Sequence, residues 1–151
     1  MTETTPPARP PRLTARESFK AWTHDKLRFA DTDKLGHVNN AVFATLLETG
    51  RVSLLYNPER PLAPPGNDFV IARLELDFRA ELHYPGTVEI GTGILSIGRN
   101  SFNVGQGLFE GERCVGTANS VLVLISHETR RSVALPQELR DRLAEFQLNA
   151  G

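Results

Sequence analysis

The strongest constraint on the fold is a long alternation of apolar and polar side chains near the middle of the chain. Between residues 70 and 83 every second residue is apolar, the set being Val70, Ala72, Leu74, Leu76, Phe78, Ala80 and Leu82. Because successive side chains of a strand point to opposite faces of a sheet, this pattern predicts one long β-strand with a single apolar face. Such a strand requires neighbouring strands and an apolar layer to cover it.

Turn residues divide the following part of the chain into further strands. These turn signals are Pro85-Gly86, residues 98–101 and Gly111. With a first strand near the N-terminus, the expected strands cover residues 24–30, 70–83, 88–97, 102–109 and 113–125. Pro136 opens a short C-terminal helix whose narrow apolar stripe consists of Leu139, Leu143 and Phe146.

One longer helix lies between the first two strands. Its apolar stripe, at helical spacing, is Phe43, Leu46, Leu47, Gly50 and Leu54. The spacing predicts a helix from about Asn40 to Tyr56, which Pro58 ends. A glycine inside the stripe predicts close contact between helix and sheet. The order of elements therefore predicts an α+β fold, with an antiparallel sheet wrapped around one long central helix and a short C-terminal helix added.

The length and the proline content suggest one domain with an N-terminal tail. A chain of 151 residues buries about 70% of its unfolded surface as a single domain. Residues 1–12 include four prolines among small and polar residues, a composition that cannot form a core and favours disorder. We therefore expect a disordered proline-rich tail over residues 1–12 and a single domain over residues 13–151.

The charge balance and the cysteine content restrict the partners and the compartment. Lys and Arg total 17 against 18 for Asp and Glu, so no strong field favours nucleic acid or an anionic membrane. Cys114 is the one cysteine, which rules out an intrachain disulfide and favours a reducing compartment. Without an apolar run long enough to cross a bilayer, we expect a cytoplasmic protein with no nucleic-acid or membrane partner.

The segment with the most chemistry is the loop over residues 28–40, which reads RFADTDKLGHVNN. It places two carboxylates, Asp31 and Asp33, just ahead of the central helix. Asn39 or Asn40 is a favoured N-cap, and the first turn of a helix carries unpaired N–H groups and a partial positive charge. This arrangement sets an acid or base beside a site that can hold a developing oxyanion.

These residues resemble the signature of the hotdog-fold acyl-CoA thioesterases, the group that includes 4-hydroxybenzoyl-CoA thioesterase, which reads aromatic-x-D-x-D-x-x-G-x-V before the central helix. The order of elements over about residues 20–140 fits the same family. The resemblance implies a hotdog fold and hydrolysis of an acyl-CoA to the free acid and CoA. It also implies a homodimer at least, and a homotetramer in many members, with the active site between subunits.

Carried over by position, Asp33 is the catalytic carboxylate, as general base on water or as nucleophile. The backbone N–H of Asn40 would polarise the thioester carbonyl. We assign Gly36, Asn39, Phe43 and Leu47 to substrate binding, while noting that Gly36 can be a simple turn glycine and Asn39 a simple cap.

Two further residues have alternative roles. His37 is a base or orienting group, or else a polar loop residue. The segment Asp33-x-Leu35-x-His37-Val38-Asn39-Asn40 resembles the D-x-N-x-H-V-N-N of acyl-carrier-protein thioesterases, but Leu35 replaces the Asn. Glu48 is a backup carboxylate, because one branch of the family uses a helical Glu; its alternative is an ion pair with Arg51.

Asp31 is expected to bond the loop backbone, or to share a raised pKa with Asp33. We expect no metal site, since no histidine has ligand spacing in the sequence, and no cofactor, since CoA is part of the substrate. Candidate partners of the CoA phosphates are Arg73, Arg99, Arg130 and Arg131. The alternatives are an acyl-carrier-protein thioesterase and a hotdog protein that binds acyl thioesters without turnover.

Overall fold

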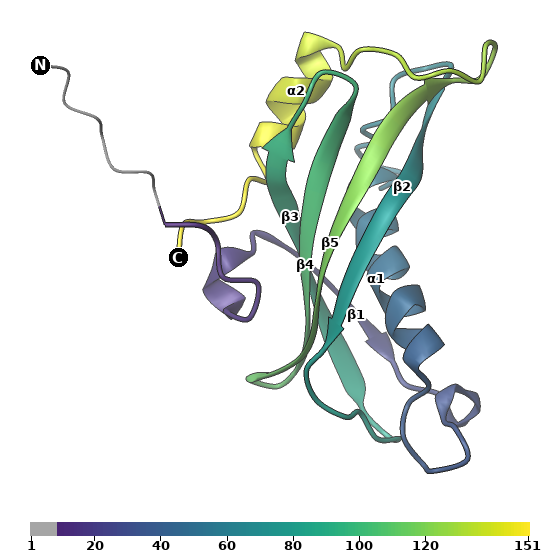
Figure 1. The fold of residues 1–151 in the computed structure, drawn as a ribbon, viewed down its shortest axis with the longest axis vertical. Helices are drawn as coiled ribbons and strands as arrows, with labels where there is room; N and C mark the ends of the chain where they lie inside the picture. The colour runs from purple at the N-terminus through teal and green to yellow at the C-terminus, as the bar shows by residue number, and fades with distance from the viewer. Residues whose placement is uncertain (1–8) are drawn as a thin grey trace, which may run out of the picture.

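The computed structural model describes residues 9–151 and consists of one five-stranded antiparallel sheet with a long helix along one face (Figure 1). The strands are β1 (Ala21–Lys26), β2 (Asn67–Phe78), β3 (Thr87–Ile97), β4 (Ser101–Glu110) and β5 (Arg113–Ser126). The helices are α1 (Asn40–Leu55), α2 (Gln137–Ala144) and the short 3₁₀ turns η1 (Arg16–Ser18) and η2 (Phe29–Asp31). The predicted hotdog architecture, with a central helix and a short C-terminal helix, is confirmed.

The strands lie in the order β1-β3-β4-β5-β2, and every neighbouring pair is antiparallel. The three central strands are largely buried, whereas β2 is mostly exposed and forms one edge of the sheet. Figure 1 shows α2 at the opposite end of the molecule from the loop that precedes α1. No helix of residues 9–151 is both long and apolar enough to cross a membrane.

Helix α1 buries the face that its sequence predicts. The buried residues of this helix are Phe43, Leu46, Leu47, Gly50, Leu54 and Leu55. Gly50 lies directly on the sheet, where a Cβ atom would come within 2.5 Å of Ile90 Cγ2 and 2.7 Å of Thr92 Oγ1. The fully buried amide of Gln106 donates to the Leu47 carbonyl at 2.9 Å and to Thr92 Oγ1 at 3.0 Å. The helix backbone therefore touches the sheet where its side chain is absent.

The prediction of one unbroken alternating strand over residues 70–83 is wrong in two respects. The register between β2 and β5 shifts between Ile71 and Arg73, so Ala72 is an inserted residue of a β-bulge. The ladder then ends at Phe78, because the N–H groups of Arg79 and Ala80 both donate to the Val115 carbonyl, at 3.0 and 3.2 Å. The bulge turns Leu74, Leu76 and Phe78 to the helix side, and the early end frees the following segment to pair elsewhere.

The first strand also differs from its prediction over residues 24–30. It covers Ala21–Lys26 and pairs with β3, because Leu27 enters the core and the chain then turns into η2. Of the tail expected over residues 1–12, residues 1–8 lie outside the described part of the chain. The carbonyl of Arg12 accepts hydrogen bonds from the N–H of Ala15 at 3.1 Å and from Ser18 Oγ at 2.6 Å.

We expect Gly50→Ala to lower the free energy of unfolding by about 1–3 kcal/mol, because the added methyl group overpacks the contact with Ile90 and Thr92. Urea denaturation measures this change. Ser53→Ala, at an exposed position of the same helix, should change the value by no more than about 0.5 kcal/mol. Equal effects of the two substitutions would contradict the close approach.

Candidate active site

The loop between β1 and α1 is closed by its own backbone. The N–H of Asp33 donates to the His37 carbonyl at 2.7 Å, and the N–H of Gly36 donates to the Asp33 carbonyl at 3.1 Å. Gly36 has φ +83, and no atom lies within 4 Å of the position where its Cβ would be. Glycine is therefore favoured here because the backbone is left-handed, and not because another group lies close by.

Asp31 has a structural position under this loop. It is 5% exposed, and its carboxylate accepts hydrogen bonds from the Arg28 N–H at 2.7 Å and from an Arg28 terminal nitrogen at 2.9 Å. Burial opposes ionisation of the carboxyl group, but the hydrogen bonds and the charge of Arg28 outweigh it and lower the pKa of Asp31. The prediction that Asp31 bonds the loop is confirmed, and the alternative of a raised pKa is wrong for Asp31.

Asp33 uses only part of its carboxylate to hold the loop. Its Oδ1 accepts hydrogen bonds from the N–H of Leu35 at 2.8 Å and from the N–H of His37 at 3.2 Å. Its Oδ2 accepts none from residues 9–151. The carboxylate is thus fixed in direction by one oxygen, while the other oxygen is available to a ligand or to water.

The start of α1 lies beside this carboxylate. Asn39 is the N-cap, because its Oδ1 accepts the N–H of Ala41 at 2.9 Å, and its own N–H donates to the Asp31 carbonyl at 2.8 Å. Asn40 is the first helical residue. Its backbone N–H finds no acceptor among the described residues, as is usual for the first turn of a helix. This donor carries the positive end of the helix dipole.

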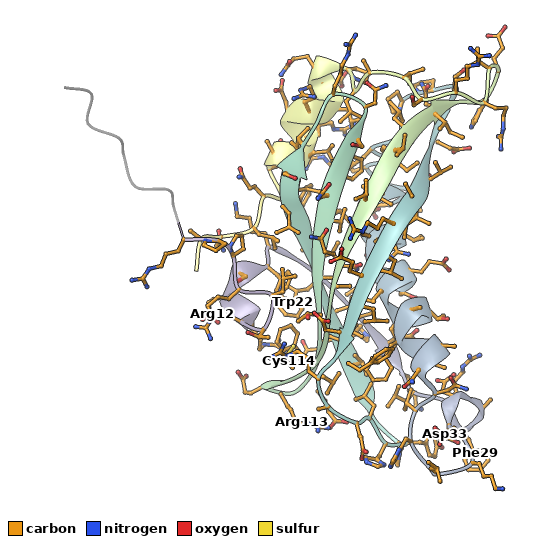
Figure 2. The ribbon with its side chains drawn as sticks, viewed as in Figure 1. Arg12, Trp22, Phe29, Asp33, Arg113 and Cys114 are labelled. Carbon is orange, nitrogen blue, oxygen red and sulfur yellow. The ribbon has the colours of Figure 1, made fainter. Side chains whose placement is uncertain are left out.

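These groups line one surface groove of about 340 Å³. Its lining residues are Asp33, His37, Val38, Asn40, Phe43, Phe78, Arg79, Ala80, Glu81 and Leu82. Figure 2 labels Asp33 on the loop at the N-terminal end of α1. The apolar floor includes Phe43, whose ring meets that of Phe78 edge to face at 5.2 Å between centroids. A carboxylate oxygen, a helix N–H and an apolar surface therefore share one groove.

Other predicted site residues lie outside this groove. Leu47 is fully buried in the core one turn further along α1. Glu48 is exposed and lines a separate groove between α1 and β2. The predicted Glu48–Arg51 ion pair is absent from the described residues; Arg51 instead donates to Gln106 Oε1 at 3.4 Å. Burial lowers the pKa of Arg51, while the charge of Glu48 acts in the opposite direction.

Sequence reasoning missed the other wall of the groove. This wall consists of Phe78, the last residue of β2, and the segment that follows it, including Arg79 and Glu81. Of the arginines proposed to hold phosphate, Arg99 lies in the turn between β3 and β4, and Arg130 and Arg131 follow β5. Figure 1 shows both segments at the opposite end of the sheet from the loop before α1. Arg73 is on β2 and pairs with Glu75. The one local signal for this wall is that the alternating pattern ends there. The position of the wall depends on its pairing with the loop before α1, which is far away in the sequence.

We expect Asp31→Ala to lower the free energy of unfolding by about 1–3 kcal/mol at neutral pH, because the substitution removes the buried carboxylate that accepts the part-buried Arg28 N–H and pairs with the Arg28 side chain. Since the folded-state pKa of Asp31 is lowered, its stabilisation is complete above the unfolded-state pKa of about 3.9 and disappears as the pH falls through the folded value. Urea denaturation at pH 7 and pH 3 should show the difference from wild type shrinking in acid.

The control for this prediction is Glu112→Gln, at an exposed hairpin position whose side chain bonds none of residues 9–151. It should have nearly the same stability as wild type at both pH values. A pH-independent effect of Asp31→Ala would mean that the charge of Asp31 does not contribute.

Solved structures with the same fold include several named thioesterases. The PA5185 protein from Pseudomonas aeruginosa strain PAO1 is 27% identical, with a TM-score of 0.79 over 95% of this chain and 99% of that one. A thioesterase from Thermus thermophilus, complexed with coenzyme A and Zn, is 28% identical, with a TM-score of 0.74 over 85% and 95%. The DHNA-CoA thioesterase from Staphylococcus aureus shares the fold at 19% identity, with a TM-score of 0.74 over 83% and 89%.

No curated protein matches the sequence significantly. The family model of the thioesterase-like superfamily matches residues 27–143. That range includes the loop with Asp33, helix α1 and the strands β2 to β5. The match covers most of the chain, and the chain therefore belongs to the thioesterase-like superfamily.

Proposed function

We propose that this protein hydrolyses acyl-CoA thioesters to the free acid and CoA in the groove beside the start of α1. The observation that carries the proposal is the presence of Asp33 and Asn40 in one groove with an apolar floor. Hydrolysis requires an attacking group, an oxyanion donor and room for an acyl chain. Three groups correspond to these requirements: Asp33 Oδ2, which accepts no hydrogen bond from residues 9–151, the N–H of Asn40, and the surface at Phe43.

The chemistry follows from these positions. The N–H of Asn40 would bind the thioester carbonyl oxygen and stabilise the negative charge that develops on it. Asp33 would either remove a proton from water as the water attacks the carbonyl carbon, or attack that carbon itself to form an acyl anhydride that water then hydrolyses. In both routes the carbon–sulfur bond breaks, CoA leaves as the thiolate and is protonated, and the acid is released.

Two observations favour CoA as the leaving group. Arg79 is an exposed cation on the groove wall opposite the helix, where it can meet a phosphate group of the substrate. One solved relative with 28% identity is a thioesterase complexed with coenzyme A. An acyl-carrier-protein substrate would present the same thioester, so a carrier-protein thioester belongs in the same assay.

We expect Asp33→Asn to lower kcat by ~10²-fold or more, because the substitution removes the attacking or proton-accepting oxygen. The measurement is thiol release over a panel of acyl-CoA chain lengths and one acyl-carrier protein. Circular dichroism and thermal melting should show little change in folding.

Glu48→Gln is the matched control, since Glu48 is an exposed carboxylate in a different groove. It should retain most of the activity. If Glu48→Gln abolishes turnover while Asp33→Asn stays active, the reaction belongs to the helix carboxylate. If wild type releases no thiol from any substrate but binds acyl-CoA, the protein is a binder without turnover.

We further propose that two copies join at the exposed edge of β2. This edge strand carries the exposed apolar residues Val70, Ile71, Leu74 and Phe78. An unpaired strand edge with apolar side chains favours pairing with a second copy. Phe78 also lines the groove of Asp33, so the partner would lie close to the site. A tetramer of two such dimers is the larger assembly to look for.

We expect Leu74→Lys to raise the dimer dissociation constant at least ~10-fold, because it places like charges near each other across the two-fold axis. Analytical ultracentrifugation measures the constant, and thiol release should fall with the dimer fraction. Leu35→Lys introduces the same charge at a side chain that is 78% exposed but lies off the edge strand. It should leave the assembly unchanged, and a stable wild-type monomer would contradict the proposal.

A further inference from the structure

The loop and the segment after β2 bring three possible metal ligands together. His37 and His83 form an isolated antiparallel bridge, and the neighbouring N–H of Val38 donates to the Leu82 carbonyl at 2.8 Å. Glu81 and His83 are two residues apart on this extended segment, so their side chains point to the same side. The candidate ligand atoms of His37, Glu81 and His83 all lie within 4.8 Å of one another.

Their separations fit coordination of a metal ion. Tetrahedral ligands at zinc bond lengths are about 3.4 Å apart, by simple geometry from bonds of about 2.0–2.1 Å. Glu81 Oε2 lies 3.3 Å from His37 Nε2 and 3.6 Å from His83 Nε2. The distances from Glu81 Oε2 to the two imidazole nitrogens are thus close to the spacing of tetrahedral ligands. Small side-chain rotations would bring both nitrogens within bonding distance of one ion.

A comparison within the same chain shows that these contacts differ from an ordinary His–carboxylate pair. His127 Nε2 lies 2.6 Å from Asp68 Oδ2, which is the distance of a short hydrogen bond. Both contacts of Glu81 are longer than that and longer than most good hydrogen bonds. His127 also has no second imidazole beside it among the metal-ligand groups of the described residues.

We propose that His37, Glu81 and His83 bind one divalent transition-metal ion of the Zn²⁺ type. Two imidazoles and one carboxylate are ligands that favour zinc, cobalt or nickel over magnesium and calcium. Three protein ligands leave a fourth position for water. His37 and Glu81 also line the groove of Asp33, so the bound ion forms part of its wall. The site does not depend on thioester hydrolysis.

Access and preorganisation support this site. The side chains of His37, Glu81 and His83 are 33%, 64% and 57% exposed, so an ion reaches them without unfolding. The backbone bridge already holds the two segments together, which reduces the ordering that binding requires. Arg113 donates to the Glu81 carbonyl at 3.0 Å and opposes a cation, but its charge is paired with Glu110 at 2.7 Å.

The test uses the tag-free full chain after removal of metal by a chelator. Addition of Co²⁺ should produce visible absorption bands that saturate at one ion per chain, and Zn²⁺ should displace them. Zn²⁺ at 100 times its dissociation constant should raise Tm by roughly 5–10 °C, because the ion binds only the folded chain.

His83→Gln and Glu81→Gln should each weaken Zn²⁺ binding by more than ~10-fold, since loss of a ligand should cost at least as much as loss of an outer partner. His127→Gln is the matched control and should bind as wild type does. Melting curves of the metal-free variants show whether each one folds. If His83→Gln is unstable, Glu81→Gln, at an exposed side chain, provides the test instead. The proposal is overturned if wild type shows neither bands nor a Tm shift, or if His127→Gln weakens binding as much as His83→Gln.

Discussion

The contact between helix α1 and the sheet at Gly50 is the constraint on which the rest of the structure depends. Without a side chain at this position, the helix backbone approaches Ile90 and Thr92, and Gln106 bonds the Leu47 carbonyl from the sheet. A buried polar side chain is tolerated there because its amide is paired on both sides. This contact sets the depth and direction of the helix. It therefore also sets where the N-terminal end of the helix, with the backbone N–H of Asn40, meets the loop.

The two aspartates of the loop show how neighbouring identical residues take different roles. Asp31 is buried and fully bonded by Arg28, and its carbonyl holds Asn39 at the helix cap. Asp33 lies in the groove with one oxygen bound to the loop and the other open among the described residues. The bonds of Asp31 fix the conformation of the loop, and that conformation orients the carboxylate of Asp33. Asp33 is the group that we propose to react, and support of such a group by a well-bonded neighbour is typical of preorganised sites.

Much of the fold could be predicted because its signals are local. The stripe of α1 with Gly50, the alternation of the strands, the turn residues and Pro136 each indicate one element within a short window, and the structure has all of these elements. The loop of the candidate site could be located for the same reason, since the N-cap and the left-handed Gly36 are local features. The misses came where distant segments compete. The bulge at Ala72, the early end of β2 and the turn of Arg51 toward Gln106 depend on β5, on Val115 and on β4.

The sequence by itself determined the kinds of elements, their order and the chemistry of the loop, because periodicity, caps and turn conformations are short-range properties of the chain. Only the tertiary structure decided which side chains face one another across the groove. Residues 79–83 reach the loop because the ladder of β2 with β5 ends where Arg79 and Ala80 both bond the Val115 carbonyl, and the segment that follows pairs with Val38. This pairing brings Glu81 and His83 to His37. Contacts between segments more than forty residues apart depend on how the strands close around the helix, and no local pattern records that geometry.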